Sequence, residues 1–296
     1  MSTFRAYQQL AKSGIVALVL ISVLGGFALL SPPGESFAWE RLAFTFFGVL
    51  FLASGSSALN QLQEWRDDAR MPRTAARPLP SGVLTKKQAA LFVAIGIVAG
   101  LLLLSQVSPQ VVALGLLALL FYNGFYTLWW KRKWAYAAIP GAIPGAIPIL
   151  IGAVAAQGSL VHKGAWYLFG LLFLWQMPHF WVLALKYRED YAQGGFPTLP
   201  VAHSRGVTVT QITLWCLAYV ALALSAPWFL DMSREATRIY IILAALLSLK
   251  LLAKLSEFRE APESKAWLQF FLWINFTLMG YLLAAAVPTY LGMLFG

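Results

Sequence analysis

Long apolar stretches make up most of the chain, and short polar segments separate them. Each stretch has about 17 to 25 residues, enough for an α-helix rising about 1.5 Å per residue to cross the roughly 30 Å hydrocarbon core of a bilayer. The nine stretches lie near residues 14–31, 41–59, 88–105, 110–129, 138–157, 164–185, 210–229, 237–255 and 267–291. The pattern predicts an all-α membrane protein with about nine transmembrane helices, forming one domain over residues 1–296.

The composition agrees with a chain that is dissolved in lipid. Hydrophobic residues make up 59% of the sequence and charged residues 11%, whereas a soluble domain has about 25% charged residues. The single cysteine, Cys216, lies within a predicted span, so the sequence offers no disulfide framework and no cysteine-based zinc site. No evident internal repeat supports an inverted-repeat transporter.

The basic residues are divided unequally between the two sides of the predicted bundle. If the N-terminus is cytoplasmic, all but four of the 22 Lys and Arg residues lie on the cytoplasmic side, and the four exceptions are Arg41, Lys163, Arg234 and Arg238. The positive-inside rule therefore predicts a cytoplasmic N-terminus and an outside C-terminus. Because anionic lipid accounts for charges that flank helices, the net charge of +10 does not indicate nucleic acid. We expect a multi-pass protein of the cell inner (cytoplasmic) membrane, in contact with lipid.

The first polar segment of chemical interest follows the second predicted span. It carries one amide and three carboxylates, Asn60, Glu64, Asp67 and Asp68. If the second helix continues through this segment, all four side chains share one face and Arg66 points elsewhere. Oxygen ligands so arranged suit Mg²⁺ bridging to a phosphate, whose other oxygens could be bound by Arg73 and Arg77. A solvated loop with internal salt bridges is the alternative.

The second polar segment lies at the end of the sixth predicted span. On a continuous helix His179, Lys186 and Asp190 would fall within about 20° of one another and line one stripe. Alternatively, the histidine is hydrogen-bonded at a proline kink, and the lysine and aspartate form an ordinary i,i+4 ion pair. The two segments place their polar faces on the same side of the bilayer, which favours the interpretation that they form the two halves of one pocket.

Aromatic residues near these segments could form the walls of such a pocket. They are Tyr122, Tyr126, Trp129, Trp130, Phe180 and Trp181. Aromatic faces can stabilise a cation and exclude water, but the same residues are also typical of an interfacial belt. Proline and glycine repeat over residues 140–148, which indicates close helix packing or, alternatively, a shaped acceptor site.

Several runs of residues carry a resemblance to a known family. Residues 60–68 read N-x-x-x-E-x-x-x-D, are followed by R-P-L-P-S-G at residues 77–82, and resemble the N-x-x-x-D-x-x-x-D signature of the UbiA superfamily of intramembrane prenyltransferases. Residues 174–179 and 196–201 read L-W-Q-M-P-H and F-P-T-L-P-V, and within that superfamily they are similar to the protoheme IX farnesyltransferases, or haem O synthases. The resemblance implies a nine-helix UbiA-like bundle, Mg²⁺, farnesyl diphosphate as donor and haem B as acceptor. It also implies haem A synthase or oxidase assembly proteins as partners.

The candidate site residues fall into three groups. The catalytic candidates are Asn60, Glu64, Asp68, Lys186 and Asp190. The candidate metal ligands are Asn60, Glu64, Asp67 and Asp68. The substrate-binding candidates are Arg73, Arg77, Tyr126, His179, Trp181, Tyr187 and Arg188.

The sequence departs from the family pattern at two places. Family members often carry D-x-D-x-D in the first motif, whereas here Glu64 and Arg66 replace its first two aspartates and Asp67 supplies a neighbouring carboxylate. The superfamily's second motif is D-x-x-x-D, but Lys186 stands four residues before Asp190, and we expect this lysine to contact diphosphate directly. The alternatives are a UbiA enzyme acting on a quinone precursor or chlorin, and a membrane transporter or scaffold. The latter is disfavoured because few polar residues lie near mid-bilayer.

Overall fold

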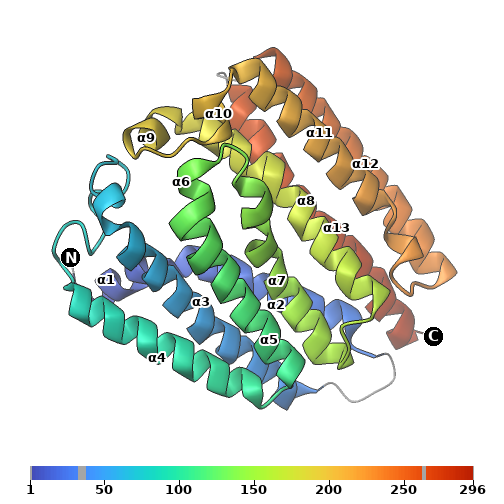
Figure 1. The fold of residues 1–296 in the computed structure, drawn as a ribbon. Coiled ribbons are helices and arrows are strands. Elements are labelled where there is room, and N and C mark those ends of the chain that lie inside the picture. Colours follow the sequence, from blue (N-terminus) through green and yellow to red (C-terminus); the bar gives the residue numbers. More distant parts are fainter. Residues whose placement is uncertain (1, 33–37, 262–264, 296) are drawn as a thin grey trace.

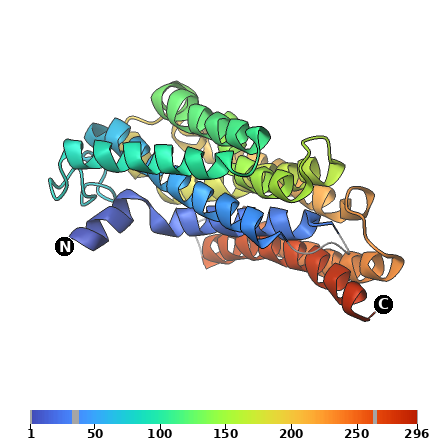
Figure 2. The ribbon, with the colours of Figure 1, turned by 90° about the horizontal axis from the view of Figure 1, so that it is seen from below.

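The computed structural model is all-helical and describes residues 2–32, 38–261 and 265–295. Within those ranges nine helical segments are long and apolar enough to cross a membrane, as the sequence predicts. They are α2 (Ser13–Leu30), α3 (Trp39–Asp68), α4 (Lys86–Ser105), the continuous segment of α5 (Pro109–Leu119), η1 (Leu120–Trp130) and α6 (Lys131–Lys133), α7 (Ala138–Gln157), α8 (Lys163–Lys186), α11 (Arg205–Leu224), α12 (Arg234–Glu260) and α13 (Lys265–Phe295). Figure 2 shows that the axes of these helices are roughly aligned, with α13 along one margin of the bundle.

Four short helices complete the described part of the fold. They are α1 (Thr3–Leu10), α9 (Arg188–Gln193), α10 (Leu199–Ala202) and the 3₁₀ turn η2 (Ala226–Trp228). Figure 1 shows α1, α6 and α9 around the same end of the bundle, on the left. The polar segments predicted to form a pocket belong to this end.

Three boundaries bear on the predictions. The second span continues as one helix, α3, to Asp68, as the spacing of its polar residues required. The seventh span was predicted to reach residue 229, but α11 ends at Leu224, because Pro227 cannot donate a backbone hydrogen bond and lies in a separate 3₁₀ turn after Ser225. The sixth ends at Lys186, and Tyr187 leaves helical geometry with φ −108° and ψ 30°. The predicted stripe of His179, Lys186 and Asp190 on one helix is therefore wrong.

Helices α2 and α7 approach each other closely enough to touch through their backbones. A methyl group on Gly26 would overlap the carbonyl oxygen of Ile149, and one on Gly152 would overlap that of Val23. Small residues allow this approach in membrane helices, whose association relies on van der Waals packing. The α2–α7 contact fixes one wall of the bundle.

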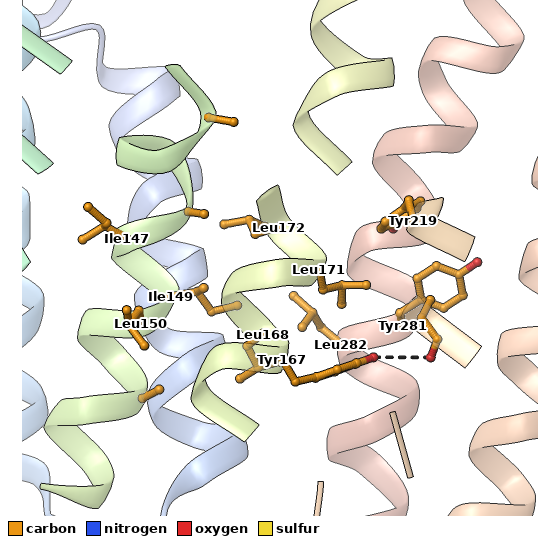
Figure 3. Packing of buried hydrophobic residues seen from close by; sticks show 14 of the residues in the cluster. Ile147, Ile149, Leu150, Tyr167, Leu168, Leu171, Leu172, Tyr219, Tyr281 and Leu282 are labelled. Carbon is orange, nitrogen blue, oxygen red and sulfur yellow. Dashed lines mark hydrogen bonds between the residues drawn. The ribbon is translucent and has the colours of Figure 1, made fainter. Parts of the chain in front are cut away.

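The opposite half of the bundle packs through large side chains. Figure 3 shows Leu168, Leu171 and Leu172 of α8 between α7 and the tyrosines of the C-terminal helices. The hydroxyl groups of Tyr167 and Tyr240 both donate to the carbonyl oxygen of Ala223, at 3.3 and 2.5 Å. These bonds satisfy buried polar groups and join α8, α11 and α12.

Candidate active site

A cavity of about 460 Å³ lies between α2, α3, the α5–η1 segment, α7 and α8. One face of α3 forms a wall of this cavity, and its lining residues recur every three or four positions from Val49 to Asp68. The lining residues of α3 are Val49, Leu52, Ala53, Ser56, Ser57, Asn60, Glu64 and Asp68. The cavity is thus polar at the end near α6 and α9 and apolar deeper in the bundle.

Two buried carboxylates stand at the polar end, and each has a basic partner. The side chains of Glu64 and Asp68 are 2% and 1% exposed. Lys131 Nζ donates to both oxygens of Glu64 at 2.9 Å, and Arg77 Nη1 donates to both oxygens of Asp68 at 2.8 Å. A buried carboxylate is tolerated only when its charge is compensated in this way.

Lys12 brings a third cation to the same place. Its Nζ donates to Asn60 Oδ1 at 2.6 Å, while Asn60 Nδ2 donates to Thr127 Oγ1 at 3.0 Å. Lys12 adopts a left-handed backbone conformation, with φ 53°, between α1 and α2. Burial, followed by the charges of Arg77 and Lys131, lowers the pKa of Lys12 to about 7. The sharp turn between α1 and α2 therefore delivers an amine to the first residue of the family motif.

Gln61 holds this turn in place. Its amide nitrogen donates to the carbonyl oxygens of Gln9 and Leu10, at 2.7 and 3.0 Å. Those carbonyls belong to the last turn of α1, and that of Gln9 also accepts from the backbone N–H of Lys12 at 3.2 Å. The two neighbouring residues of α3, Asn60 and Gln61, thus bind the side chain of Lys12 and the backbone that precedes it.

A fourth cation, Arg73, connects the loop after α3 to α9. Its Nε lies 3.6 Å from Asp190 Oδ2, and its guanidinium group lies over the rings of Tyr187 and Tyr191, 5.0 and 5.8 Å from their centroids. Arg73 and Tyr191 line the cavity. Asp190 and Tyr187 therefore contact the site through Arg73.

The η1 segment supplies an aromatic wall. It is a π-helix, and the rings of Tyr122 and Tyr126 stack within it, 6.0 Å between centroids, and both line the cavity. A methyl group on Gly141 of α7 would lie 2.6 Å from the ring of Tyr126, so this glycine makes room for that ring. π-Helical turns are rare and are often found at functional sites. Tyr126, a predicted substrate contact, thus faces the predicted pocket.

Several other predicted site residues lie outside the cavity. Arg132 donates to Asp67 at 2.6 Å, and Asp67 is absent from the lining residues that the structure describes. His179 stacks on Trp175 at 4.6 Å between ring centroids, and Lys186 Nζ lies 5.5 Å from the ring centroid of Trp267. Two further predicted contacts, Trp181 and Arg188, are also absent from the lining residues that the structure describes. Among the described residues no cluster of three or more His, Cys, Asp or Glu side chains forms a ready metal site.

Among the polar residues that line the cavity, sequence reasoning missed Lys12, Lys131 and Gln176 as well as three small hydroxyl residues, Ser56, Ser57 and Thr74. The two lysines flank predicted spans, where the positive-inside rule already explains them, so neither had a distinguishing signal. The amide of Gln176 donates to the carbonyl oxygen of Ala142 at 3.0 Å and lies against Gly145. The run W-Q-M-P-H pointed to this region, although only its histidine was singled out.

The arrangement fits an amphiphilic anion. The four cations Lys12, Arg73, Arg77 and Lys131 outnumber the two carboxylates that line the cavity. This excess of positive charge suits a group with several negative oxygens, such as a diphosphate. The apolar part of the cavity suits a long hydrocarbon tail. Fold and cavity together therefore suit a lipid-like phosphate.

Comparison with known proteins identifies the family. The sequence profile of the UbiA prenyltransferase family matches residues 19–292, so the chain belongs to this family. A protein of Bdellovibrio bacteriovorus named protoheme IX farnesyltransferase is 41% identical over 284 residues, which cover 96% of each chain. Protoheme IX farnesyltransferase 2 of Vibrio campbellii is 33% identical and covers 98% of this chain and 93% of its own. The resemblance predicted from the sequence is confirmed.

Solved structures share the fold. An apo UbiA homolog from Aeropyrum pernix K1 superposes with a TM-score of 0.72 at 18% identity, covering 95% of this chain and 98% of its own. A UbiA homolog from Archaeoglobus fulgidus, bound to GPP and Mg²⁺, has a TM-score of 0.64 at 14% identity and covers 95% of this chain and 99% of its own. These likenesses confirm the UbiA-like helical fold.

Proposed function

We propose that this protein transfers the farnesyl group of farnesyl diphosphate to a vinyl group of haem B, giving haem O for haem-copper oxidase biogenesis. The observation that carries the proposal is the cavity, which has four cations and two carboxylates at its polar end. It belongs to a chain whose near full-length relatives are named protoheme IX farnesyltransferases. The name of those relatives points to farnesyl diphosphate as the lipid-like phosphate that this cavity would bind.

The reaction breaks the bond between C1 of the farnesyl group and the diphosphate oxygen. The vinyl carbon of haem attacks C1, water adds to the second vinyl carbon, and a proton is released. The leaving diphosphate gains negative charge, so groups already positioned to bind that charge lower the barrier. Lys12, Arg73, Arg77 and Lys131 lie where they can bind these oxygens. No nucleophilic side chain is needed.

The donor set fits Mg²⁺. Asn60, Glu64 and Asp68 present hard oxygen ligands to the cavity from one face of α3. These three residues would hold the ion, which would supply positive charge against the negative charge that develops on the leaving diphosphate. The ammonium of Lys12 and the ammonium of Lys131 contact two of these residues and could then turn to the phosphate oxygens. Asp67 is the fourth predicted ligand. Because it does not line the cavity, substitution of Asp67 tests whether it belongs to the metal site.

The remaining site assignments are part of the proposal. Asp190 would hold Arg73 toward the diphosphate, because their side chains are 3.6 Å apart. Tyr122 and Tyr126 would shield the allylic cation from water. His179 would serve the acceptor and Lys186 the donor. Further substrate contacts are proposed for Trp181, Tyr187 and Arg188.

We also propose the setting in which the enzyme acts. The unequal distribution of basic residues supports a cytoplasmic N-terminus, an outside C-terminus and insertion in the cell inner membrane. The whole chain would form one prenyltransferase domain. Haem A synthase or oxidase assembly proteins are the proposed partners, since they would receive haem O.

The acceptor can be tested directly. Purified protein given haem B, farnesyl diphosphate and Mg²⁺ should yield haem heavier by one farnesyl group plus a hydroxyl, detected by mass analysis and by the pyridine haemochrome spectrum. Omission of Mg²⁺ provides the control. Transfer only to a phenolic quinone precursor or to a chlorin would retain the prenyltransferase and remove the haem assignment.

A further inference from the structure

The apolar part of the cavity has a defined length along α3. Below Asn60 its lining on this helix consists of Ser57, Ser56, Ala53, Leu52 and Val49. Val49 precedes Asn60 by eleven residues, which corresponds to about 16 Å along the helix axis. The diphosphate-binding groups lie at or above Asn60, so this distance measures the space available to the prenyl tail.

The deep end of this space is closed. Val49, Leu52 and Ile151, which line it from α3 and α7, are 4%, 5% and 2% exposed. Gly115 of α5 completes the end wall. By contrast, Ile15 lines the upper part and is 57% exposed, so the cavity meets the lipid near its polar end and not at its base.

Side chains behind the end wall leave no further room. A methyl group on Gly115 would lie 2.9 Å from Leu52 Cδ2 and 3.1 Å from Leu104 Cδ1. Leu104 of α4 is fully buried, and its side chain also packs against Gly48 of α3. The base of the cavity is therefore a packed plug made by Val49, Leu52 and Leu104 around Gly115.

The depth of the cavity matches three isoprene units. A farnesyl chain has twelve carbons in line, which extend roughly 14 Å for C–C bonds of about 1.5 Å. A fourth isoprene unit adds four bonds and roughly 5 Å, so a geranylgeranyl chain would exceed the available 16 Å or so. A geranyl chain would leave the base empty and lose apolar contact.

We infer that Val49, Leu52 and Gly115, backed by Leu104, set the length of the donor's prenyl chain. The inference rests on the proposed function, because it takes a prenyl diphosphate as the donor. It adds the residues that select the length of the donor's prenyl chain. The selection is steric for longer chains and hydrophobic for shorter ones, because the plug is apolar and the cavity ends there. The acceptor plays no part in it.

The test measures binding without any acceptor. Full-length protein in detergent with Mg²⁺ binds radiolabelled farnesyl diphosphate, and unlabelled geranyl, farnesyl and geranylgeranyl diphosphates compete. We expect farnesyl diphosphate to compete at least about tenfold better than geranylgeranyl diphosphate, the size of effect that a misfit in an apolar pocket produces. Leu52→Ala and, independently, Val49→Ala should remove most of that difference. Gly115→Ala, which drives the end of Leu52 into the cavity, should weaken farnesyl binding and spare geranyl binding.

The control is Leu102→Ala on α4, the same substitution at a side chain that is 63% exposed on the outer surface. It should leave the ranking of the three donors unchanged. Equal binding of farnesyl and geranylgeranyl diphosphates by the unaltered protein would overturn the inference, as would an unchanged ranking in both folded plug variants. Failure of every prenyl diphosphate to bind would instead remove the proposed function.

Discussion

The ammonium group of Lys131 lies 2.9 Å from each carboxylate oxygen of Glu64, although the two residues are 67 positions apart. Glu64 occupies the place where the family motif carries aspartate. Its partner stands at the junction of the π-helix and α6, and both line the cavity. Glu64, the residue that departs from the motif, therefore forms a buried ion pair that joins α3 to the fourth span.

Breaking this pair from one side should destabilise the protein. Lys131→Met leaves the carboxylate of Glu64, which is 2% exposed, without its cation, and such an uncompensated charge costs about 3 kcal/mol. The double variant Glu64→Gln with Lys131→Met should recover most of that loss, while farnesyl transfer should be lost in both. Denaturant unfolding in mixed micelles measures the free energy of unfolding of each variant. Equal stability of single and double variants would show that the pair is not coupled.

Asp68 and Asp67 provide a matched test of the metal site. Asp68→Asn should abolish turnover at every Mg²⁺ concentration, because Asp68 is 1% exposed and faces the cavity. Asp67→Asn should keep turnover within about threefold of the unaltered protein, because its carboxylate bonds to Arg132 outside the lining. Both proteins should remain extractable in detergent. Loss of activity in Asp67→Asn, with the Mg²⁺ requirement raised, would return that residue to the ligand set.

The sequence could predict those features that depend on one helix at a time. The nine spans follow from hydropathy, and the shared face of Asn60, Glu64 and Asp68 follows from spacing. The end of α11 could not be found this way, because apolar residues continue through Pro227. Lys12 acquires its place only through a left-handed turn and the packing of α1 against α3. Contacts between helices produce no periodic pattern in the sequence, so they could not be predicted from it.

Orientation can be tested at two positions on opposite ends of the bundle. In a background with the buried Cys216 replaced by serine, a cysteine at exposed Ala75 should resist an impermeant reagent added to intact cells. A cysteine at Val161, which is 89% exposed between α7 and α8, should react. Both should react after the cells are broken. The reverse pattern in intact cells would invert the proposed topology.

The roles proposed for His179 and Lys186 should separate kinetically. His179→Ala should raise the apparent KM for haem and leave that for farnesyl diphosphate nearly unchanged, and Lys186→Ala should do the opposite, provided substrate release is fast. Both side chains contact aromatic rings outside the cavity, so a purely packing role is the competing outcome. Unchanged constants in folded variants would assign them to packing.

The backbone contact between α2 and α7 makes the two sides of the cavity mechanically unequal. Where Gly26 meets Ile149 and Gly152 meets Val23, no side chain stands between the helices, so no rotamer change can let them part or slide. The helices α8, α11, α12 and α13 meet through leucine and tyrosine side chains, which can reorient. The α2–α7 wall of the cavity is thus stiff, whereas α8, which also lines the cavity, is backed by side chains that can reorient, so α8 must yield whenever a large flat molecule enters beside the prenyl chain.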